Sequence, residues 1–271
     1  MPQHSFVLPM LLPERYTIQS FPPPYNVQVT PYLEVNDFSK VIRHELLHVQ
    51  RNFKLKPCKV IFVGDVSVGK TTIVNRFCYD KYEGNYKATI GVDFEIERFN
   101  ILGHDFILEM WDTAGQERFK SIAQAYYRNA NIVVVVFDIS NHDTLQSAST
   151  WLKNALAVNT LQKPLLFLVG TKSDKLSKED FLHAEKLAAE VAEGIKAEYW
   201  SLSARSGYKI VDFFHRIAAL AFESAMKEAI IENKSFEESI GGEIQHQSMN
   251  FYNKLACKEK SCRRRRSYCL C

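Results

Sequence analysis

The sequence has no long hydrophobic run and no large excess of one charge. Its longest apolar stretches, residues 132–137 and 165–169, are far too short for a membrane-spanning helix, which needs about 20 apolar residues. The first residues also lack the basic start and apolar run of a secretory signal. A formal net charge of +3 over 271 residues predicts no charge field over the whole molecule that would attract nucleic acid or a membrane.

Cysteine is scarce and unevenly distributed. Two of the six cysteines, Cys58 and Cys78, are expected in the core, and the other four crowd the last fifteen residues. This distribution is not a disulfide framework. It predicts a reducing, cytosolic compartment.

Residues 1–56 are poor in glycine and hold seven of the nine prolines. The run Pro22-Pro23-Pro24 favours an extended polyproline segment. We therefore expect an N-terminal extension, 1–56, that is largely disordered and carries one helix at about 37–52.

The run GDVSVGKT, from Gly64 to Thr71, matches the phosphate-binding pattern G-x-x-x-x-G-K-[ST] in full. In such a loop, backbone N–H groups and a helix N-terminus surround an anion. Lys70 can reach the outer phosphates, and the Thr71 hydroxyl can hold Mg²⁺. A buried strand at 58–63 and a helix at 71–78 give the motif the context it needs, which a chance glycine turn would lack.

Strand and helix patterns alternate after residue 57. Strands are expected at 94–102, 106–111, 132–139, 165–170 and 198–201, and helices at 144–158, 180–191 and 209–231. This order predicts an α/β fold with a mostly parallel sheet and helices on both faces. Apolar periodicity fades after about Ile231, and 231–271 is expected to be a flexible tail.

The run His44-Glu45-Leu46-Leu47-His48 matches the H-E-x-x-H pattern of zinc proteases. Only 63 residues precede the phosphate loop, which leaves no room for a protease domain, and no third zinc ligand stands out. We interpret the run as an ordinary amphipathic helix.

A second motif, Trp111-Asp112-Thr113-Ala114-Gly115-Gln116, follows an expected strand. Asp112 can hold Mg²⁺ through water, the Gly115 N–H can approach a terminal phosphate, and Gln116 can orient an attacking water. An ordinary strand-to-turn junction is the alternative. The spacing from the phosphate loop favours the nucleotide site.

Base recognition is assigned to Thr171-Lys172-Ser173-Asp174, which ends a strand. A carboxylate at Asp174 can accept both N1–H and the exocyclic amine of guanine, a donor pair that adenine lacks. The stem of Lys172 can lie on the base. Ser203-Ala204-Arg205 follows the next strand, where the Ala204 N–H can meet the guanine carbonyl.

The motif order GDVSVGKT, YKATIGVDF, WDTAGQERF, TKSD and SAR resembles that of the Ras-superfamily small GTPases. The runs IGVDF, ERF and YYR resemble the Rab branch, in particular a subgroup associated with Golgi, lysosome positioning and ciliary traffic. The resemblance covers about 57–230 and implies a P-loop G domain with a six-stranded, mostly parallel sheet. It does not reach the N-terminal extension.

The resemblance implies GTP or GDP and Mg²⁺ as ligands. Thr71 and Thr89 would ligate Mg²⁺ with Asp112 nearby, Tyr82 would pack on the base, Tyr86 would cover the phosphates, and Gln116 would be the catalytic residue. The implied nucleotide contacts are Asp65, Val66, Ser67, Val68, Gly69, Lys70, Thr71, Thr72, Tyr82, Tyr86, Thr89, Gly115, Thr171, Lys172, Asp174, Ser203, Ala204 and Arg205.

Phe94, Trp111 and Tyr126 match the aromatic trio that Rab proteins present to effectors. Core packing is the alternative role for these three side chains, and each could serve both.

Three positions depart from the commonest residues of the family. Val66 replaces glycine or serine beside the γ-phosphate, and its branched side chain predicts slow intrinsic hydrolysis. Thr171 replaces asparagine and predicts a weaker link between the base and the phosphate loop. Arg205 replaces lysine, with little expected consequence, because the Ala204 N–H is unaffected.

The sequence ends in a Cys-x-Cys pattern, Cys269 and Cys271, which resembles the doubly geranylgeranylated end of Rab proteins. Two lipid chains give stable anchoring where one gives marginal binding. Residues 254–271 carry seven basic side chains and one acidic one, a net charge of +6 that would attract anionic membrane surfaces. A solvated basic tail with free thiols, or a nuclear localisation signal, is the alternative.

The resemblance implies a GTPase switch that recruits effectors in vesicle trafficking, on the cytoplasmic face of Golgi or vesicle membranes with a cytosolic pool. The implied partners are an exchange factor, an activating protein, a GDP dissociation inhibitor, an escort protein with its geranylgeranyl transferase, and effectors, but no nucleic acid. A GTP-locked scaffold without useful turnover is the second hypothesis. A P-loop ATPase or kinase is the third, and Asp174 argues against it.

Overall fold

The computed structural model describes residues 16–49, 53–84, 89, 91–113, 125–159 and 164–240. The chain divides into two compact units. The first unit joins Met1–Phe38 to Lys56–Glu223, and the second joins Ser39–Leu55 to Ser224–Cys271.

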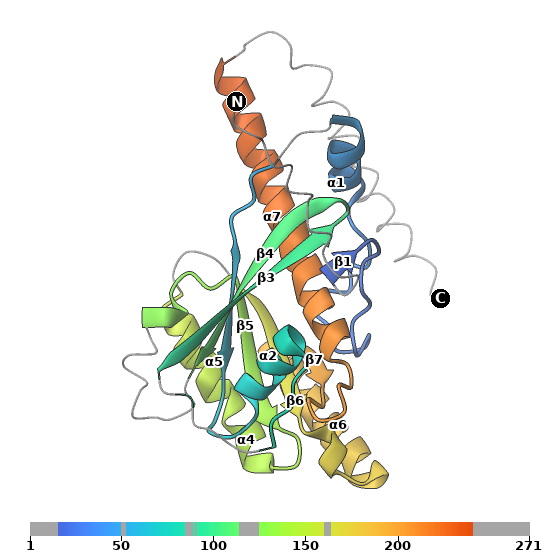
Figure 1. Ribbon diagram of the computed structural model, residues 1–271, viewed down its shortest axis with the longest axis vertical. Coiled ribbons are helices and arrows are strands. Elements are labelled where there is room, and N and C mark those ends of the chain that lie inside the picture. The colour runs from blue at the N-terminus through green and yellow to red at the C-terminus, as the bar shows by residue number, and fades with distance from the viewer. Residues whose placement is uncertain are drawn as a thin grey trace, which may run out of the picture. The chain divides into compact units, whose positions relative to one another are not determined.

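A seven-stranded sheet forms the centre of the first unit, in the order β1-β3-β4-β2-β5-β6-β7 (Figure 1). The strands are β1 (Thr17–Ile18), β2 (Cys58–Val63), β3 (Val92–Ile101), β4 (His104–Thr113), β5 (Ile132–Asp138), β6 (Leu165–Thr171) and β7 (Glu198–Ser201). Among the strand pairs of the described residues, only β3–β4 is antiparallel. Its turn at Leu102-Gly103 has positive φ at both residues, as tight hairpins require.

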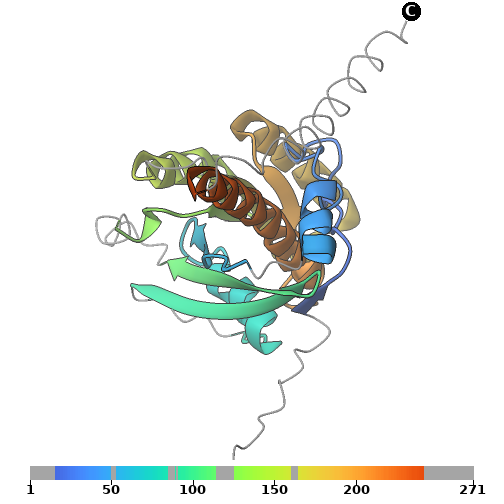
Figure 2. The same cartoon turned by 90° about the horizontal axis from the view of Figure 1, so that it is seen from above.

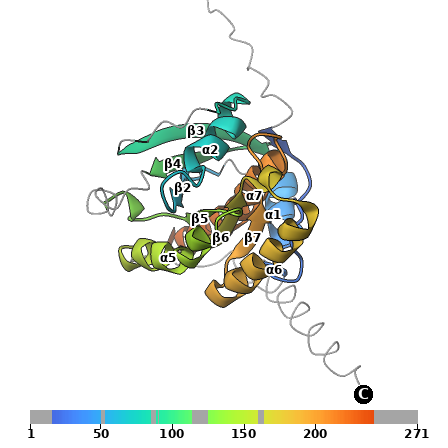
Figure 3. The same cartoon turned by 90° about the horizontal axis from the view of Figure 1, so that it is seen from below.

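The helices of the first unit cover both faces of this sheet (Figure 3). They are α2 (Lys70–Tyr79), α4 (His142–Gln146), α5 (Ala148–Ala157), α6 (Lys178–Ile195) and the first part of α7 (Ile210–Ile240). Every residue of β5 is buried, because helices pack on both of its sides. The mostly parallel α/β fold expected from the sequence is confirmed.

The alternation of strand side chains divides the core into two layers. Ile61 points into a cluster with Trp151 of α5 and Ala188 of α6. Phe62, the next residue, faces the other way and contacts Phe214 of α7. On that side, Phe222 of α7 also contacts Phe106 of β4, a strand of the β3–β4 hairpin. Figure 2 shows this hairpin from above.

The first described residues correct the expectation of a six-stranded sheet and a largely disordered extension. Residues 16–38, which we call the docked segment, add β1 as a seventh strand, parallel to β3. Tyr16, Phe21 and Phe38 are buried, so aromatic side chains outweigh the proline content on which the expectation of disorder rested.

In the second unit, α1 (Lys40–His44) begins at a Ser39 cap and continues as a π-helix, η2 (Glu45–Val49). The H-E-x-x-H run falls on this helix. Within the described residues, no group of three His, Cys, Asp or Glu side chains is placed to hold a metal ion.

Helix α7 runs on to Ile240 and not to the expected end near Ile231. The three glutamates and the one lysine between Ile231 and Ile240 are good helix formers even without an apolar stripe, which explains the difference. Among the helices of the described ranges, none is long and apolar enough to cross a membrane.

Candidate functional site

The predicted phosphate loop connects β2 to α2, as expected. Its backbone has positive φ at Gly64, Ser67 and Gly69. A Cβ atom on Gly64 would lie 2.1 Å from the Val136 carbonyl oxygen, so no other residue fits there without moving β5.

Lys70 opens α2 and folds its side chain back over this loop. Its Nζ donates to the carbonyl oxygens of Gly64 at 2.9 Å and Asp65 at 2.8 Å. Burial lowers the pKa of Lys70 to about 8, against the opposing pull of Asp112 and Asp65. An anionic ligand would favour the charged ammonium, so the site suits phosphate.

Three oxygen-bearing side chains from separate segments meet beside Lys70. The Thr71 hydroxyl lies 2.8 Å from the Thr89 hydroxyl and donates to Asp112 Oδ2 at 2.5 Å. Burial raises the pKa of Asp112 to about 6, although the hydrogen bond from Thr71 lowers it. Asp112 Oδ1 is buried and has no partner among the described residues. A set of hard oxygens with one unsatisfied carboxylate atom fits Mg²⁺.

The other end of the site holds the predicted base-recognition residues. The Ser203 hydroxyl donates to Asp174 Oδ1 at 2.6 Å, and Arg205 lies 3.9 Å from Oδ2 of the same carboxylate. Ala204 lies between them in sequence and lines the same cavity as Asp174.

Thr171 is buried and joins three parts of the site. Its hydroxyl contacts the Val68 carbonyl of the phosphate loop and, at 3.0 Å, the Phe137 carbonyl of β5. The shorter side chain at this position therefore still reaches the phosphate loop.

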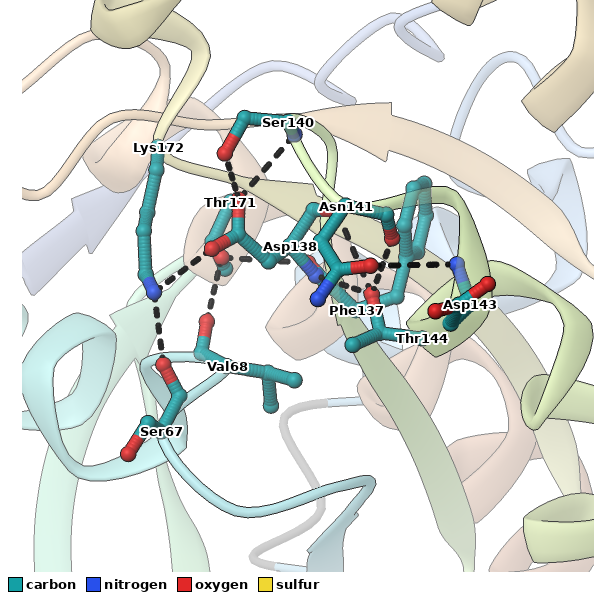
Figure 4. A network of polar contacts seen from close by, with 10 residues as sticks. All are labelled: Ser67, Val68, Phe137, Asp138, Ser140, Asn141, Asp143, Thr144, Thr171 and Lys172. Carbon is teal, nitrogen blue, oxygen red and sulfur yellow. Dashed lines mark hydrogen bonds and ion pairs between the residues drawn. The ribbon is translucent and has the colours of Figure 1, made fainter.

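Lys172 forms a second bridge, which Figure 4 shows with its neighbours. Its Nζ donates to the Ser67 carbonyl at 2.6 Å and to Asp138 Oδ2 at 2.7 Å. Asp138 Oδ1 accepts from both the backbone N–H and the hydroxyl of Ser140. The sequence reasoning missed Asp138, although a carboxylate closing the apolar run 132–137 was a signal that could have found it.

One cavity of about 750 Å³ joins the two ends of the site. Its lining runs from Lys70 and Thr89 past Tyr82 to Asp174 and Ala204. Its volume lies in the range of small-molecule binding sites.

Further predicted contacts lie around the cavity. Ser67, Gly69, Thr72, Thr171, Lys172 and Arg205 line it, as does Val66, whose side chain is 38% exposed. Asp65 instead turns its carboxylate to the Trp151 indole N–H at 2.7 Å. Tyr86, Gly115, Gln116, Cys269 and Cys271 lie outside the described residues.

The predicted effector trio forms one aromatic group. The Phe94 ring meets Trp111 edge-on at 5.0 Å, and Trp111 lies 5.7 Å from Tyr126. Phe94 is 44% exposed, so core packing alone does not account for it. Lys59 places its Nζ 4.2 Å from the centre of the Trp111 ring.

Comparison with known proteins agrees with this geometry. Residues 59–223 match the model of the Ras family. The chain is 47% identical to the Ras-related protein Rab-34 of Rattus norvegicus over 209 residues, which cover 76% of this chain and 80% of the relative. It is also 47% identical to the Ras-related protein Rab-36 of Homo sapiens over 187 residues, which cover 69% and 70%.

Proposed function

The chain belongs to the Rab branch of the Ras family of small GTPases, and from this we propose how its own residues bind the nucleotide and set the rate of turnover. As a Rab GTPase it hydrolyses GTP to GDP and phosphate and acts in vesicle trafficking. The observation that carries the proposal is one cavity with a phosphate-binding end at Lys70 and a base-binding end at Asp174.

At the phosphate end, the backbone N–H groups of the loop and the Lys70 ammonium bind the β- and γ-phosphates. Lys70 is already held by the loop carbonyls, so little side-chain entropy is lost when a phosphate binds. Thr71, Thr89 and Asp112 are the residues that would hold Mg²⁺. The ion, when bound, neutralises charge on the phosphate oxygens.

At the base end, Asp174 accepts N1–H and the exocyclic amine of guanine, and the Ala204 N–H meets the guanine carbonyl. The Ser203 hydroxyl fixes the Asp174 carboxylate, which favours the orientation that guanine needs. Tyr82 packs on the base, and Tyr86 covers the phosphates. Gly115 and Gln116 serve the γ-phosphate and the attacking water.

A substitution at Asp174 tests the assignment. Wild-type protein should bind GTP and GDP and not ATP in a titration with fluorescent nucleotides. Asp174→Asn replaces an acceptor by a donor, so it should lose guanine binding and gain xanthine nucleotides, which carry a carbonyl where guanine has its amine. Unchanged preference for GTP in Asp174→Asn would contradict the assignment.

The output of the switch is reversible binding of effectors at a membrane. The proposed effector face consists of Phe94, Trp111 and Tyr126, because Trp111 contacts both other rings and Phe94 is exposed. Cys269 and Cys271 are the proposed sites of geranylgeranylation, and the basic residues before them add attraction to anionic lipids. The cytoplasmic face of Golgi or vesicle membranes is the proposed location, with a cytosolic pool.

The proposed regulators are proteins that act on the cycle between the GTP and GDP forms. An exchange factor, an activating protein, a GDP dissociation inhibitor, and an escort protein with its geranylgeranyl transferase are the proposed partners. A pull-down with GTP-loaded Gln116→Leu against the GDP form would identify the effectors.

A protein locked on GTP remains the second candidate, because Val66 lines the cavity at the phosphate loop. Single-turnover hydrolysis separates the two.

A further inference from the structure

The part of the docked segment (16–38) that follows β1 contacts β7 and α6 through Tyr25 and Thr30, and Figure 3 shows these two elements beside one another. β7 leads directly into 202–205, the residues that we call the base loop. The docked segment therefore contacts the strand that carries the base loop.

Tyr25 is the first anchor of the docked segment on this strand. Its ring lies 5.8 Å from that of Tyr199 and 5.7 Å from that of Trp200, both in β7. Its hydroxyl donates to Glu185 of α6 at 3.1 Å, and the Tyr199 hydroxyl donates to the other oxygen of Glu185 at 2.7 Å. Glu185 thus clamps one tyrosine of the docked segment and one of β7 together.

The Tyr25 hydroxyl keeps its proton in this position. Burial, together with the charge of Glu185, raises the pKa of Tyr25. The donor to Glu185 is therefore present at all physiological pH values.

Glu198 is the second anchor. It forms an ion pair with Arg216 at 2.9 Å, and both side chains are fully buried. The Thr30 hydroxyl of the docked segment also donates to Glu198. Arg216 donates in turn to the Pro22 carbonyl at 2.9 Å and the Val35 carbonyl at 3.2 Å. The docked segment therefore satisfies hydrogen bonds of a buried ion pair that begins β7.

The other end of β7 holds the base loop. The Leu202 N–H donates to the Gly170 carbonyl at 2.7 Å, and the Leu202 carbonyl accepts from the Ser173 N–H at 3.3 Å. The next residue, Ser203, places its hydroxyl on Asp174. A shift of β7 would therefore move both the Ala204 N–H and the hydroxyl that orients Asp174.

We propose that the docked segment positions the base loop, with Tyr25 and Thr30 as positioning residues for guanine-nucleotide binding. The inference rests on the proposed function and assigns to this part of the N-terminal extension a role in nucleotide affinity. Both residues act through β7 and touch no nucleotide.

Tyr32 supplies a matched control within the same segment. Its hydroxyl accepts from the Leu166 N–H at 2.6 Å and donates to the Leu166 carbonyl at 3.4 Å. Tyr32→Phe therefore removes the hydrogen bonding of a partly buried tyrosine, as Tyr25→Phe does. Leu166 lies in β6, whereas Tyr25 and Thr30 hold α6 and β7, and it is β7 that leads into the base loop. A general loss of stability would affect both variants, whereas loss of base positioning would affect only Tyr25→Phe.

The experiment measures release of a fluorescent GDP from the full chain in wild type, Tyr25→Phe, Thr30→Val and Tyr32→Phe. Thermal unfolding midpoints are recorded for each. Competition with GDP and with IDP, which lacks the exocyclic amine, reports how well Asp174 is oriented.

We expect Tyr25→Phe and Thr30→Val to speed GDP release about threefold to tenfold, the range that loss of one hydrogen bond allows. Both variants should reduce the ratio of GDP affinity to IDP affinity. Tyr32→Phe should leave the release rate and this ratio unchanged. Release at the wild-type rate in Tyr25→Phe and Thr30→Val would overturn the inference, as would equal acceleration in Tyr32→Phe. Failure of the wild type to bind GDP would instead overturn the proposed function, and the inference with it.

Discussion

Lys172 Nζ lies 2.7 Å from Asp138 Oδ2, and this ion pair joins the ends of β6 and β5 beside the phosphate loop. The same ammonium donates to the Ser67 carbonyl. Asp138 therefore fixes the position of Lys172 (Figure 4). In this position the stem of Lys172 can support the base, and its ammonium group supports the phosphate loop.

Asp138→Asn should accelerate GDP release, because the amide cannot form the ion pair and Lys172 gains freedom. Hydrogen bonds to charged groups contribute about 1.5–3 kcal/mol, so release should be faster by about tenfold to a hundredfold. Stopped-flow release of a fluorescent GDP measures the effect. Asp143→Asn, an exposed carboxylate in the adjacent helix α4, is the control and should release GDP at the wild-type rate.

The contribution of Asp138 to stability should depend on pH with a defined sign. Burial raises the pKa of Asp138, but hydrogen bonds from Lys172 and Ser140 outweigh it, and the net pKa is lowered. A carboxylate with a lowered folded pKa stabilises the protein above its ordinary pKa and loses that contribution as the pH falls through the folded value. The difference in unfolding free energy between wild type and Asp138→Asn should stay constant from pH 8 to about pH 5 and shrink below about pH 4. A difference that grows on acidification would contradict the ion pair.

Thr171→Val should destabilise the protein although the two side chains have nearly the same shape. The substitution leaves the Val68 and Phe137 carbonyls without their buried donor, which costs about 1–3 kcal/mol. Urea unfolding of the nucleotide-free protein measures this. Thr171→Ser keeps the hydroxyl and is the control. If both variants lost the same stability, the methyl group and not the hydroxyl would be responsible.

Gly64→Ala should abolish tight nucleotide binding. The added Cβ would lie 2.1 Å from the Val136 carbonyl oxygen, so the phosphate loop must move away from β5. Gly103→Ala is the control, because Gly103 also has positive φ but has open space around its Cβ position. It should cost only about 1 kcal/mol of stability from backbone strain and leave GDP affinity unchanged. Tight GDP binding by Gly64→Ala would show that the loop can relax.

The sequence signals of the proposed nucleotide site are local. Glycines with positive φ, a lysine at the start of a helix and carboxylates at strand ends each depend on neighbours in the chain. The docked segment depends on partners far away: Tyr25 on Glu185, and Thr30 on Glu198. Its aromatic residues follow neither a strand nor a helix period, so the expectation of disorder rested on the prolines. Asp138 had a local signal, since it ends the apolar run 132–137, but its role depends on Lys172 at the end of another strand.

The last prediction concerns Val66, whose side chain lines the cavity at the phosphate loop. A branched side chain there would crowd the attacking water or an incoming arginine, so Val66→Ser should hydrolyse GTP faster. A gain on the order of threefold is expected, which corresponds to less than 1 kcal/mol in the barrier. Single-turnover hydrolysis of GTP measures it. Val211→Ser is the matched control: Val66 and Val211 are 38% and 41% exposed, but Val211 lies on α7 and outside the cavity lining. Hydrolysis by wild type that is faster than by Val66→Ser would refute the role of Val66, and equal gains in both variants would assign the effect to the loss of an exposed valine in general.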